Sequence, residues 1–460
     1  MARILIVAND VVSGRMAGPG IRCFELGQQL RGAGHHVTIA GVEASDLPSM
    51  GIEVVPPMSQ EAMNTLANSN DAALLEGFAL VRYPNLACLG LPLIVDLYDP
   101  FPLALLEQDS HQSMGERKLG AERVLSALRA LLTVGDYFIC ASERQRDLWI
   151  GSLLANGRVN PESWDRDNSL RALIDVVPFG VSDAPPPHRE PLFRERIRTG
   201  LSETDLVLLW GGGIYNWFDP LTLIRAVSEV AKIRPEVKLV FMSTTHPQKG
   251  VPERMWMPGK ARQLADHLGV TDKQVIFNDS WVPYDERGAW LAAADAGVST
   301  HFNNAETSYA FRTRMLDYLW AGLPVICTDG DYFASLVRER GLGWVVAPED
   351  QAGLQQAILQ LADDAGERSE VCSRVAFTAA TMTWSTACVP LLRYCEHLRH
   401  APDASRGSPV ERVRRRGGQE VQHLAGLVRL GIRSLRTDGA LATARRASRW
   451  WGARSRRAKG

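Results

Sequence analysis

The hydrophobic residues of this chain fall into short, uninterrupted runs, and each run is followed by a polar loop. The first run, residues 4–8, leads into a glycine-rich loop, 9–20, and then into a segment, 21–33, with apolar residues at helical spacing. A second run follows at 37–40. Short continuous runs are typical of parallel strands buried on both faces, and this order of elements is that of a Rossmann-type unit. We therefore expect residues 4–8 to form a first strand and not the core of a signal peptide.

The same order of elements recurs along the chain and predicts two domains in tandem. A proline-rich stretch, 182–189, breaks every periodicity and indicates a stiff linker. After it, the run 206–210 meets three glycines and a helix pattern that begins at Asp219 and Pro220. The expected fold class is α/β, with two tandem Rossmann-like parallel-sheet domains and an interdomain cleft. Further strands are expected at 72–75, 91–95, 137–141 and 174–178, and at 237–242, 275–277, 296–299 and 325–328.

Length and composition support two globular domains. The chain has 460 residues, of which 45% are hydrophobic and 22% charged, and this length is too great for one ordinary core. None of its apolar runs is long enough to cross a membrane. The seven cysteines show no C-x-x-C spacing, so we expect reduced thiols in a cytoplasmic protein, without a disulfide framework or a zinc site.

Positive charge is concentrated at the C-terminal end. Residues 401–460 hold fifteen Lys or Arg and four Asp or Glu, a net charge of +11, whereas residues 1–400 sum to −12. Apolar residues within 424–435 keep a helical spacing, and Trp450 and Trp451 stand near the end. Such a tail suits an anionic membrane surface; the alternatives are a solvated tail or a patch that attracts nucleic acid. Because no nucleic-acid-binding motif accompanies the charge, no nucleic-acid partner is expected.

Candidate ligand groups follow the expected strands of the first domain. Gly18 and Gly20 stand before a helix that carries Arg22, so their amides either approach a ligand or only form a turn. The loop lacks the G-x-G-x-x-G spacing, which argues against a nicotinamide or flavin cofactor. Asp96 and Asp99 follow a strand and are either ligand groups or helix caps.

The second domain carries a candidate anion site. Glycines 211–213 leave backbone amides unshielded just before a helix, a suitable cradle for a diphosphate. The segment 306–331 begins with Glu306 and contains Arg312 and Arg314, whose planar guanidinium groups suit phosphate. On a helix two such positions diverge by about 200°, so only one arginine is expected to face a phosphate. The alternative is that both pair with nearby acids.

Five segments in combination resemble the glycosyltransferases of the GT-B fold, specifically the retaining group called glycosyltransferase family four. The resemblance covers residues 1 to about 395. Where many family members have a lysine after the second glycine loop, this chain has Tyr215. The resemblance also implies that the last helices, within 373–400, return toward the first domain. The five segments are 18–20, 177–181, 210–213, 277–284 and 306–331.

The family has a pair of glutamates, and this chain has an acid at only one of the two positions. They stand eight positions apart before a G-x-P-V turn, and in this chain Asp317 occupies the second position and Tyr309 the first. The first glutamate contacts the hydroxyls of the donor sugar. The resemblance implies that this role passes to Glu306, to the asparagines at 303 and 304, or to the backbone of 307–310.

The resemblance implies transfer of a sugar, of the hexosyl type, from a nucleotide-diphosphate sugar to a glycan or polyprenyl-linked acceptor. It also implies retention through a front-face mechanism, with neither a metal nor a cofactor. Arg312 or Arg314 would bind the diphosphate, Asp317 would hold the ribose hydroxyls, and the backbone of Trp281 and Val282 would meet the base. The remaining candidates are Gly211, Gly212 and Gly213 for the diphosphate, Asp96, Asp99 and Glu306 for catalysis, and Gly18, Gly20 and Arg22 in the first glycine loop.

Two other functions remain open at this point. A sugar-nucleotide epimerase of the same fold would turn over the donor without an acceptor, and a degenerate, non-catalytic partner would only bind it. The expected organisation is a first domain at 1–182, a linker at 183–200, a donor domain at 201–372, returning helices at 373–400 and the basic tail at 401–460. A location on the inner face of the cytoplasmic membrane would follow if the tail binds lipid.

Overall fold

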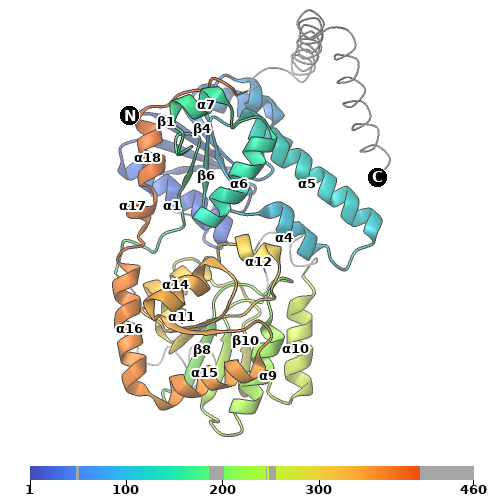
Figure 1. Cartoon of the computed structure of the whole chain (residues 1–460), viewed down its shortest axis with the longest axis vertical. Coiled ribbons are helices and arrows are strands. Elements are labelled where there is room, and N and C mark those ends of the chain that lie inside the picture. The colour runs from blue at the N-terminus through green and yellow to red at the C-terminus, as the bar shows by residue number, and fades with distance from the viewer. Residues whose placement is uncertain (48–50, 186–200, 245, 248–254, 405–460) are drawn as a thin grey trace, which may run out of the picture. The chain divides into compact units, whose positions relative to one another are not determined.

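The chain forms two parallel β-sheets, each flanked by helices (Figure 1). The fold is a computed structural model that describes residues 1–47, 51–185, 201–244, 246–247 and 255–404. The expected fold class, two Rossmann-like α/β domains in tandem, is confirmed. Most of the predicted linker, 186–200, and the basic tail from 405 onward lie outside the described residues.

The first sheet has seven strands in the order β3-β2-β1-β4-β5-β6-β7, and its neighbouring strands are parallel. Ile4 of the central strand β1 pairs with Val37 on one side and Ala72 on the other. From Ile4 to Val7 the successive side chains of β1 point to opposite faces and are fully buried, which explains its uninterrupted apolar run. The strands are β1 (Arg3–Val7), β2 (His36–Ala40), β3 (Glu53–Val55), β4 (Ala72–Glu76), β5 (Leu93–Asp96), β6 (Tyr137–Cys140) and β7 (Ile174–Val176).

The helices of the first domain begin where the sequence supplies capping groups. The hydroxyl of Ser142 accepts the amide N–H of Gln145, as its predicted role of N-cap requires, and Ser113 forms a capping box with Glu116. The helices are α1 (Gly18–Gly32), α2 (Gln60–Asn68), α3 (Ala79–Arg82), η1 (Pro84–Cys88), α4 (Phe101–Gln108), α5 (Met114–Val134), α6 (Glu143–Ala155) and α7 (Pro161–Arg166).

The second sheet has six strands in the order β10-β9-β8-β11-β12-β13, again parallel. In both sheets the strand order reverses beside the first strand, and crevices for ligands open at the carboxyl ends of strands at such points. The strands are β8 (Leu206–Trp210), β9 (Val237–Phe241), β10 (Val275–Phe277), β11 (Ala296–Ser299), β12 (Val325–Thr328) and β13 (Gly343–Val346).

The helices of the second domain repeat the capping pattern. The carboxylate of Asp219 accepts the amide N–H of Thr222, and Pro220 stands at the first helical position, both as predicted. The helices are α9 (Pro220–Val230), α10 (Met257–His267), α11 (Arg287–Ala292), α12 (Ala305–Tyr309), α13 (Arg314–Trp320), α14 (Tyr332–Arg340), α15 (Gln351–Asp363) and α16 (Ala365–Ala379).

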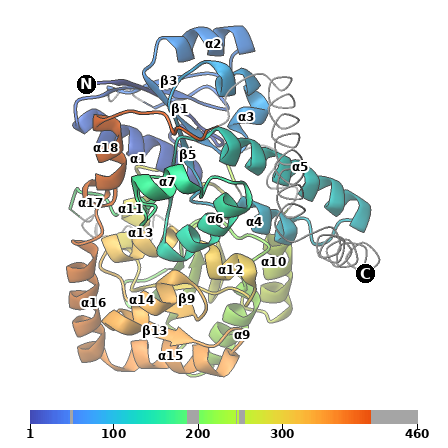
Figure 2. The ribbon, with the colours of Figure 1, turned by 45° about the horizontal axis from the view of Figure 1, so that its top comes forward.

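After α16 the chain passes back to the first domain, where α17 (Trp384–Ala387) and α18 (Val389–Glu396) lie beside α1 (Figures 1 and 2). Tyr394 of α18 stacks on Tyr137 with ring centroids 4.3 Å apart. This returning segment is hydrogen-bonded to the outgoing one. The amide of Val181 donates to the carbonyl of Met382 at 2.8 Å, and the amide of Trp384 donates to the carbonyl of Val181 at 3.1 Å.

Two strands were not anticipated from the sequence, β3 and β13. Both lie at an edge of their sheet and are partly exposed. An edge strand needs fewer apolar side chains than a central one, and β3 accordingly lacks an uninterrupted apolar run. The apolar run of β13, residues 344–347, is present in the sequence but was not assigned to a strand.

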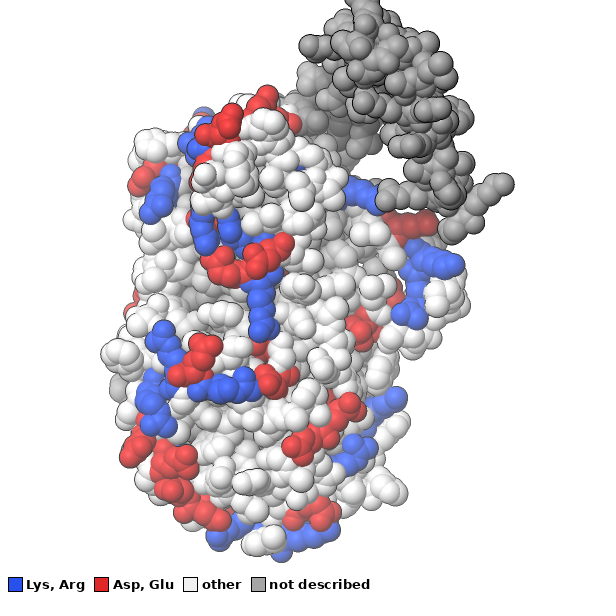
Figure 3. Space-filling view, in the orientation of Figure 1, with Lys and Arg blue, Asp and Glu red and all other residues white. Residues whose placement is uncertain are grey.

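Positive and negative side chains are interspersed over the described part of the face shown in Figure 3. Exposed ion pairs of the described residues include Arg338 with Asp329 at 2.6 Å and Lys232 with Glu229 at 2.7 Å. Among the described residues, no helix combines the length and the apolar character that crossing a membrane requires.

Candidate functional site

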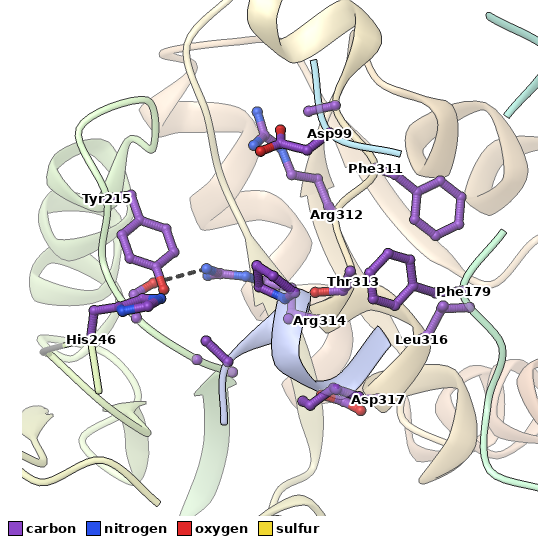
Figure 4. A pocket seen from close by; sticks show the side chains of 18 of the residues that line it. Asp99, Phe179, Tyr215, His246, Phe311, Arg312, Thr313, Arg314, Leu316 and Asp317 are labelled. Atoms are coloured by element: carbon purple, nitrogen blue, oxygen red, sulfur yellow. Dashed lines mark hydrogen bonds between the residues drawn. The ribbon is translucent and has the colours of Figure 1, made fainter. Parts of the chain in front are cut away.

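A cavity of about 310 Å³ lies between the two domains, at the carboxyl ends of strands from both sheets. Its walls come from the loops after β1, β5 and β8 and from the segment that leads into α13 (Figure 4). This is where an open α/β sheet positions ligand-binding groups. Its charged and polar lining includes Asp99, Tyr215, His246, Arg287, Glu306, Arg312, Thr313, Arg314 and Asp317.

Arg314 is the cation at the glycine-loop end of the cavity. It is 7% exposed, and its Nη2 donates to the carbonyl of Gly213 at 2.8 Å, the bond dashed in Figure 4. Its guanidinium group stacks on the rings of Phe218 and Trp210, 4.1 and 4.7 Å from their centroids. Nη1 is buried and has no hydrogen-bond partner among the described residues. Burial lowers its pKa to about 10, so the group is still charged at neutral pH. A buried cation with an unused N–H is suited to bind an anion.

The glycine loop beside Arg314 supplies less than the sequence suggested. All three glycines line the cavity, but the amide N–H of Gly211 is engaged by the hydroxyl of Tyr318 at 2.8 Å. The prediction that Gly211 offers its amide to a diphosphate is therefore corrected. Gly212 has φ +76°, a conformation that favours glycine, and a Cβ at Gly213 would lie 3.0 Å from the ring of Tyr215.

Arg312 is bound to an acid of its own domain. Its Nη1 and Nη2 donate to the two carboxylate oxygens of Glu306 at 3.0 and 2.6 Å, and both side chains are about 95% buried. Nε has no hydrogen-bond partner among the described residues. α13 begins only at Arg314, so Arg312 lies in the preceding loop, and the two arginines point apart (Figure 4). Of the two predicted phosphate ligands, Arg314 is the one that is not neutralised by a carboxylate.

Asp99 lines the cavity from the first domain and points toward Arg312 (Figure 4). Burial raises its pKa to about 7; the negative charges of Glu306 and Asp96 act in the same direction, and the cation of Arg312 opposes them. Asp99 can therefore exchange a proton near neutral pH.

Asp96, the second predicted acid of this loop, does not reach the cavity. It is fully buried and accepts two hydrogen bonds from Arg22, at 2.5 and 3.1 Å. Arg22 also donates to the carbonyl of Val177 at 2.8 Å and is itself fully buried. The predictions that Asp96 is catalytic and that Arg22 meets a ligand are therefore corrected, because the two charges neutralise each other beneath the site.

The two glycines of the first loop have different surroundings. Gly18 lines the cavity, and a Cβ there would lie 3.5 Å from the hydroxyl of Thr313 in the second domain. A Cβ at Gly20 would lie 2.0 Å from the carbonyl oxygen of Val11, so glycine is required there for close packing. Gly20 thus serves the packing of α1 against Val11, and neither of the two expected roles, a turn or contact with a ligand, applies to it.

Asp317 lines the cavity beside Arg287, a residue that the sequence analysis did not select. The Oδ1 of Asp317 lies 3.3 Å from Nη1 of Arg287, whose guanidinium group is 4.1 Å from the ring centroid of Tyr284. Burial raises the pKa of Asp317, while Arg287 and Arg314 oppose that shift. The carboxylate is thus held between two cations at the cavity wall.

The far wall of the cavity is aromatic. Trp281 and Val282 line it as expected, but the amide of Val282 is taken by the hydroxyl of Ser243 at 3.3 Å. His246 lies between Trp281 and Tyr215, with ring centroids 5.8 and 6.0 Å away. Burial lowers the pKa of His246 to about 4, so its imidazole is neutral at neutral pH.

Several lining residues were therefore missed: Tyr215, His246, Arg287 and the Tyr284 beneath it. Tyr215 alone had a sequence signal, because it stands two positions after the three glycines, where many members of the resembled family have a lysine. Among the described residues, no group of three or more His, Cys, Asp or Glu side chains is arranged to hold a metal ion.

Residues 205–364 match a protein family described as glycosyl transferases group 1. Among curated proteins the chain is similar to the D-inositol 3-phosphate glycosyltransferase of Streptomyces avermitilis, with 26% identity over 194 residues. That match covers 42% of this chain and 40% of the relative. A Stackebrandtia nassauensis protein of the same name is 24% identical over 243 residues, 52% of each chain. The matched part thus spans about half the length of these relatives or less.

Solved structures show the same fold over nearly their whole length. HepE of Anabaena, solved in complex with UDP and glucose, aligns with a TM-score of 0.64 and 16% identity over 86% of this chain and 100% of its own. Sucrose-phosphate synthase of Thermosynechococcus elongatus aligns with a TM-score of 0.63 and 14% identity over 86% and 99%. Residues 205–364 thus form a glycosyl transferases group 1 domain, in a chain with the GT-B glycosyltransferase fold.

Proposed function

We propose that the chain is a glycosyltransferase that moves a sugar from a nucleoside-diphosphate sugar to an acceptor hydroxyl. The observation that carries this proposal is the buried Arg314, whose Nη1 is unused at the glycine-loop wall of the cavity. Breaking the bond between sugar and phosphate leaves negative charge on the diphosphate. A preorganised cation in a dry site stabilises that charge as it develops.

The donor lies against the second domain in this proposal. Arg314 and the loop of Gly212 and Gly213 contact the diphosphate. Asp317, oriented by Arg287 at 3.3 Å, accepts hydrogen bonds from the ribose hydroxyls. The base lies against Trp281, whose buried Nε1 has no hydrogen-bond partner among the described residues. HepE, a protein with the same fold, has been solved with UDP-glucose.

The sugar and the acceptor lie between Arg314 and the first domain. Glu306, held by Arg312, faces the sugar hydroxyls and takes the role of the glutamate that Tyr309 replaces. Asp99 approaches from the first domain. With a pKa of about 7 its carboxyl group can accept a hydrogen bond from the hydroxyl of the acceptor substrate when ionised, and donate one to it when protonated. Transfer proceeds with retention on the front face, where the departing phosphate accepts the proton of the attacking hydroxyl.

The finer features of the function belong to the same proposal. The enzyme is a family-four hexosyltransferase that needs no metal or cofactor. Its acceptor is a glycan or a polyprenyl-linked sugar, in the synthesis of a surface polysaccharide or glycolipid. WaaG, a glycosyltransferase involved in lipopolysaccharide biosynthesis, aligns with a TM-score of 0.60 at 17% identity. The basic tail holds the cytoplasmic enzyme at the inner face of the membrane.

The test is release of nucleoside diphosphate from a panel of donor sugars, with and without a membrane lipid extract. Release that depends on the extract, and that persists in EDTA, supports a metal-independent transferase. A donor whose sugar changes configuration without any extract would indicate an epimerase. Binding of nucleoside diphosphate without turnover of any donor would indicate the non-catalytic alternative, and each of these two outcomes refutes the transferase. A chain that ends at residue 400 but still sediments with anionic vesicles as the whole chain does would refute the membrane role of the tail.

A further inference from the structure

Gln145 is a fully buried amide at the start of α6 that connects the two domains. Its Oε1 accepts the backbone N–H of Ala141 at 2.7 Å, within its own domain. Its Nε2 donates one hydrogen bond to the carbonyl of Tyr98 at 2.6 Å and another to the carbonyl of Tyr309 at 2.8 Å. Both hydrogens of the Nε2 group are therefore used, one in each domain.

The two carbonyl groups belong to the two halves of the candidate site. Tyr98 is the residue before Asp99, the acid that lines the cavity from the first domain. Tyr309 ends α12, which contains Glu306 and leads directly to Arg312. One nitrogen atom thus binds the backbone of the loop that carries Asp99 and the backbone of the segment that carries the Glu306–Arg312 ion pair.

This bridge differs from the other interdomain hydrogen bond of α6. Arg144, the neighbouring residue, donates from Nη1 to the carbonyl of Gly330 at 3.1 Å, but that contact is exposed and can be replaced by water. The contacts of Gln145 are buried or partly buried. A carbonyl in such surroundings that loses its donor is left poorly satisfied, so removal of this amide weakens the contact between the two segments.

We propose that Gln145 is a positioning residue that fixes the separation between Asp99 and the Glu306–Arg312 pair when the domains are closed. The role rests on the proposed function, because it assigns the acceptor hydroxyl to the first domain and the donor sugar to the second. A misplacement of about 1 Å between reacting groups can lower a rate about 100-fold. Donor binding is independent of Gln145, since the residues proposed for the diphosphate all lie in the second domain.

The experiment compares Gln145→Met, which keeps the side-chain length but has no donor, with the matched control Arg144→Met. Three quantities are measured for each full-length protein: kcat with the best donor, the Kd for the nucleoside diphosphate that binds tightest among UDP, GDP, ADP and dTDP, and hydrogen exchange. We expect kcat to fall about 10- to 100-fold in Gln145→Met with a Kd within twofold of the unchanged protein. Exchange should accelerate in residues 97–105 and 305–314. Arg144→Met should change kcat less than threefold.

Two results would overturn the role of Gln145. One is a Gln145→Met protein with an unchanged kcat and unchanged exchange in both segments. The other is a parallel loss of kcat and nucleotide affinity with accelerated exchange throughout the chain, which would show general destabilisation instead of positioning. If the protein without any substitution transfers no sugar from any donor, that result would instead overturn the proposed function. The two failures are therefore distinguishable.

Discussion

Replacement of Arg314 by methionine tests whether the charge and the unused Nη1 of this side chain bind the diphosphate. Methionine keeps much of the apolar contact with Phe218 and Trp210 but removes the charge and the unused Nη1. A unit charge about 4 Å from a phosphate oxygen contributes about 4 kcal/mol at an effective dielectric constant of 20. A charge-assisted hydrogen bond contributes a net 1.5–3 kcal/mol or so after desolvation. We therefore expect a loss of about 2–3 kcal/mol in diphosphate binding, or about a 30- to 150-fold rise in Kd.

The assay is calorimetric titration with two ligands, the nucleoside diphosphate that binds tightest and its parent nucleoside. The loss should be confined to the diphosphate, because the base and ribose are assigned to Trp281 and Asp317. Arg338→Met is the matched control: it removes a cation whose side chain is 54% exposed and paired with Asp329, so both affinities should stay within twofold.

The reasoning about Arg314 is refuted if Arg314→Met binds the diphosphate within threefold of the unchanged protein. It is also refuted if the nucleoside and the diphosphate lose affinity equally, since a charge cannot act on a neutral ligand to the same extent. Circular dichroism spectra should be those of a folded protein, which checks that the variant keeps its fold. The carbonyl of Gly213 also accepts a hydrogen bond from Nε1 of Trp210 at 3.2 Å, so it keeps a donor in the variant and only a modest loss of stability is expected.

Three further predictions concern the acids. Asp99→Asn should remove the limb near pH 7 from the pH profile of kcat/KM, since the carboxyl pKa is about 7; a limb that persists would exclude Asp99 as its source. Glu306→Gln removes the carboxylate that accepts two hydrogen bonds from the buried Arg312, so urea unfolding should show a loss of about 3–5 kcal/mol; Asp329→Asn, in an exposed pair, should lose under about 1 kcal/mol, and equal losses would contradict the burial argument. Burial raises the pKa of Glu76 from 4.5 to about 8, so the folded state favours the neutral acid and stability falls as pH rises between these values; Glu76→Gln should flatten this dependence in urea unfolding at pH 5.5 and 8.5, and an unaltered slope would reject the assignment.

The fold was predictable because a central parallel strand can be identified from its own residues alone. Each must be apolar on both faces, so the runs at 4–8 and 206–210 identify strands without any knowledge of their neighbours. Helix starts were equally local, because the capping groups of Ser142 and Asp219 act within three residues. The edge strand β3 could not be found in this way, because Glu53 interrupts its apolar residues, whereas the run of β13 at 344–347 could have been recognised.

The site was predictable only in part, because its roles are decided by contacts between distant residues. Asp96 and Asp99 stand three positions apart and look equivalent in the sequence. Asp96 ends β5 and meets Arg22, 74 residues away, whereas Asp99 lies in the loop that reaches the cavity. Gln145 has no local signature at all, since its partner Tyr309 is 164 residues away.

Three-dimensional contacts also explain why two arginines that look equivalent in the sequence have different surroundings in the structure. Arg312 and Arg314 differ in their contacts because Glu306 binds the first, whereas the second donates to the carbonyl of Gly213. In the sequence, the alternatives of phosphate binding and structural pairing applied to both. In the structure Arg312 makes the structural pair with Glu306, and Arg314 remains the proposed phosphate ligand.

The two chain crossings joined at Val181 and Met382 determine how the domains can turn. Since two backbone hydrogen bonds tie the crossings together, they cannot slide past each other and behave as one pivot. Trp384, beside the pivot, also lines the cavity and packs on Phe179 with ring centroids 5.6 Å apart. Any rotation about this pivot therefore displaces the cavity wall near Trp384 least, because that wall lies beside the joined crossings.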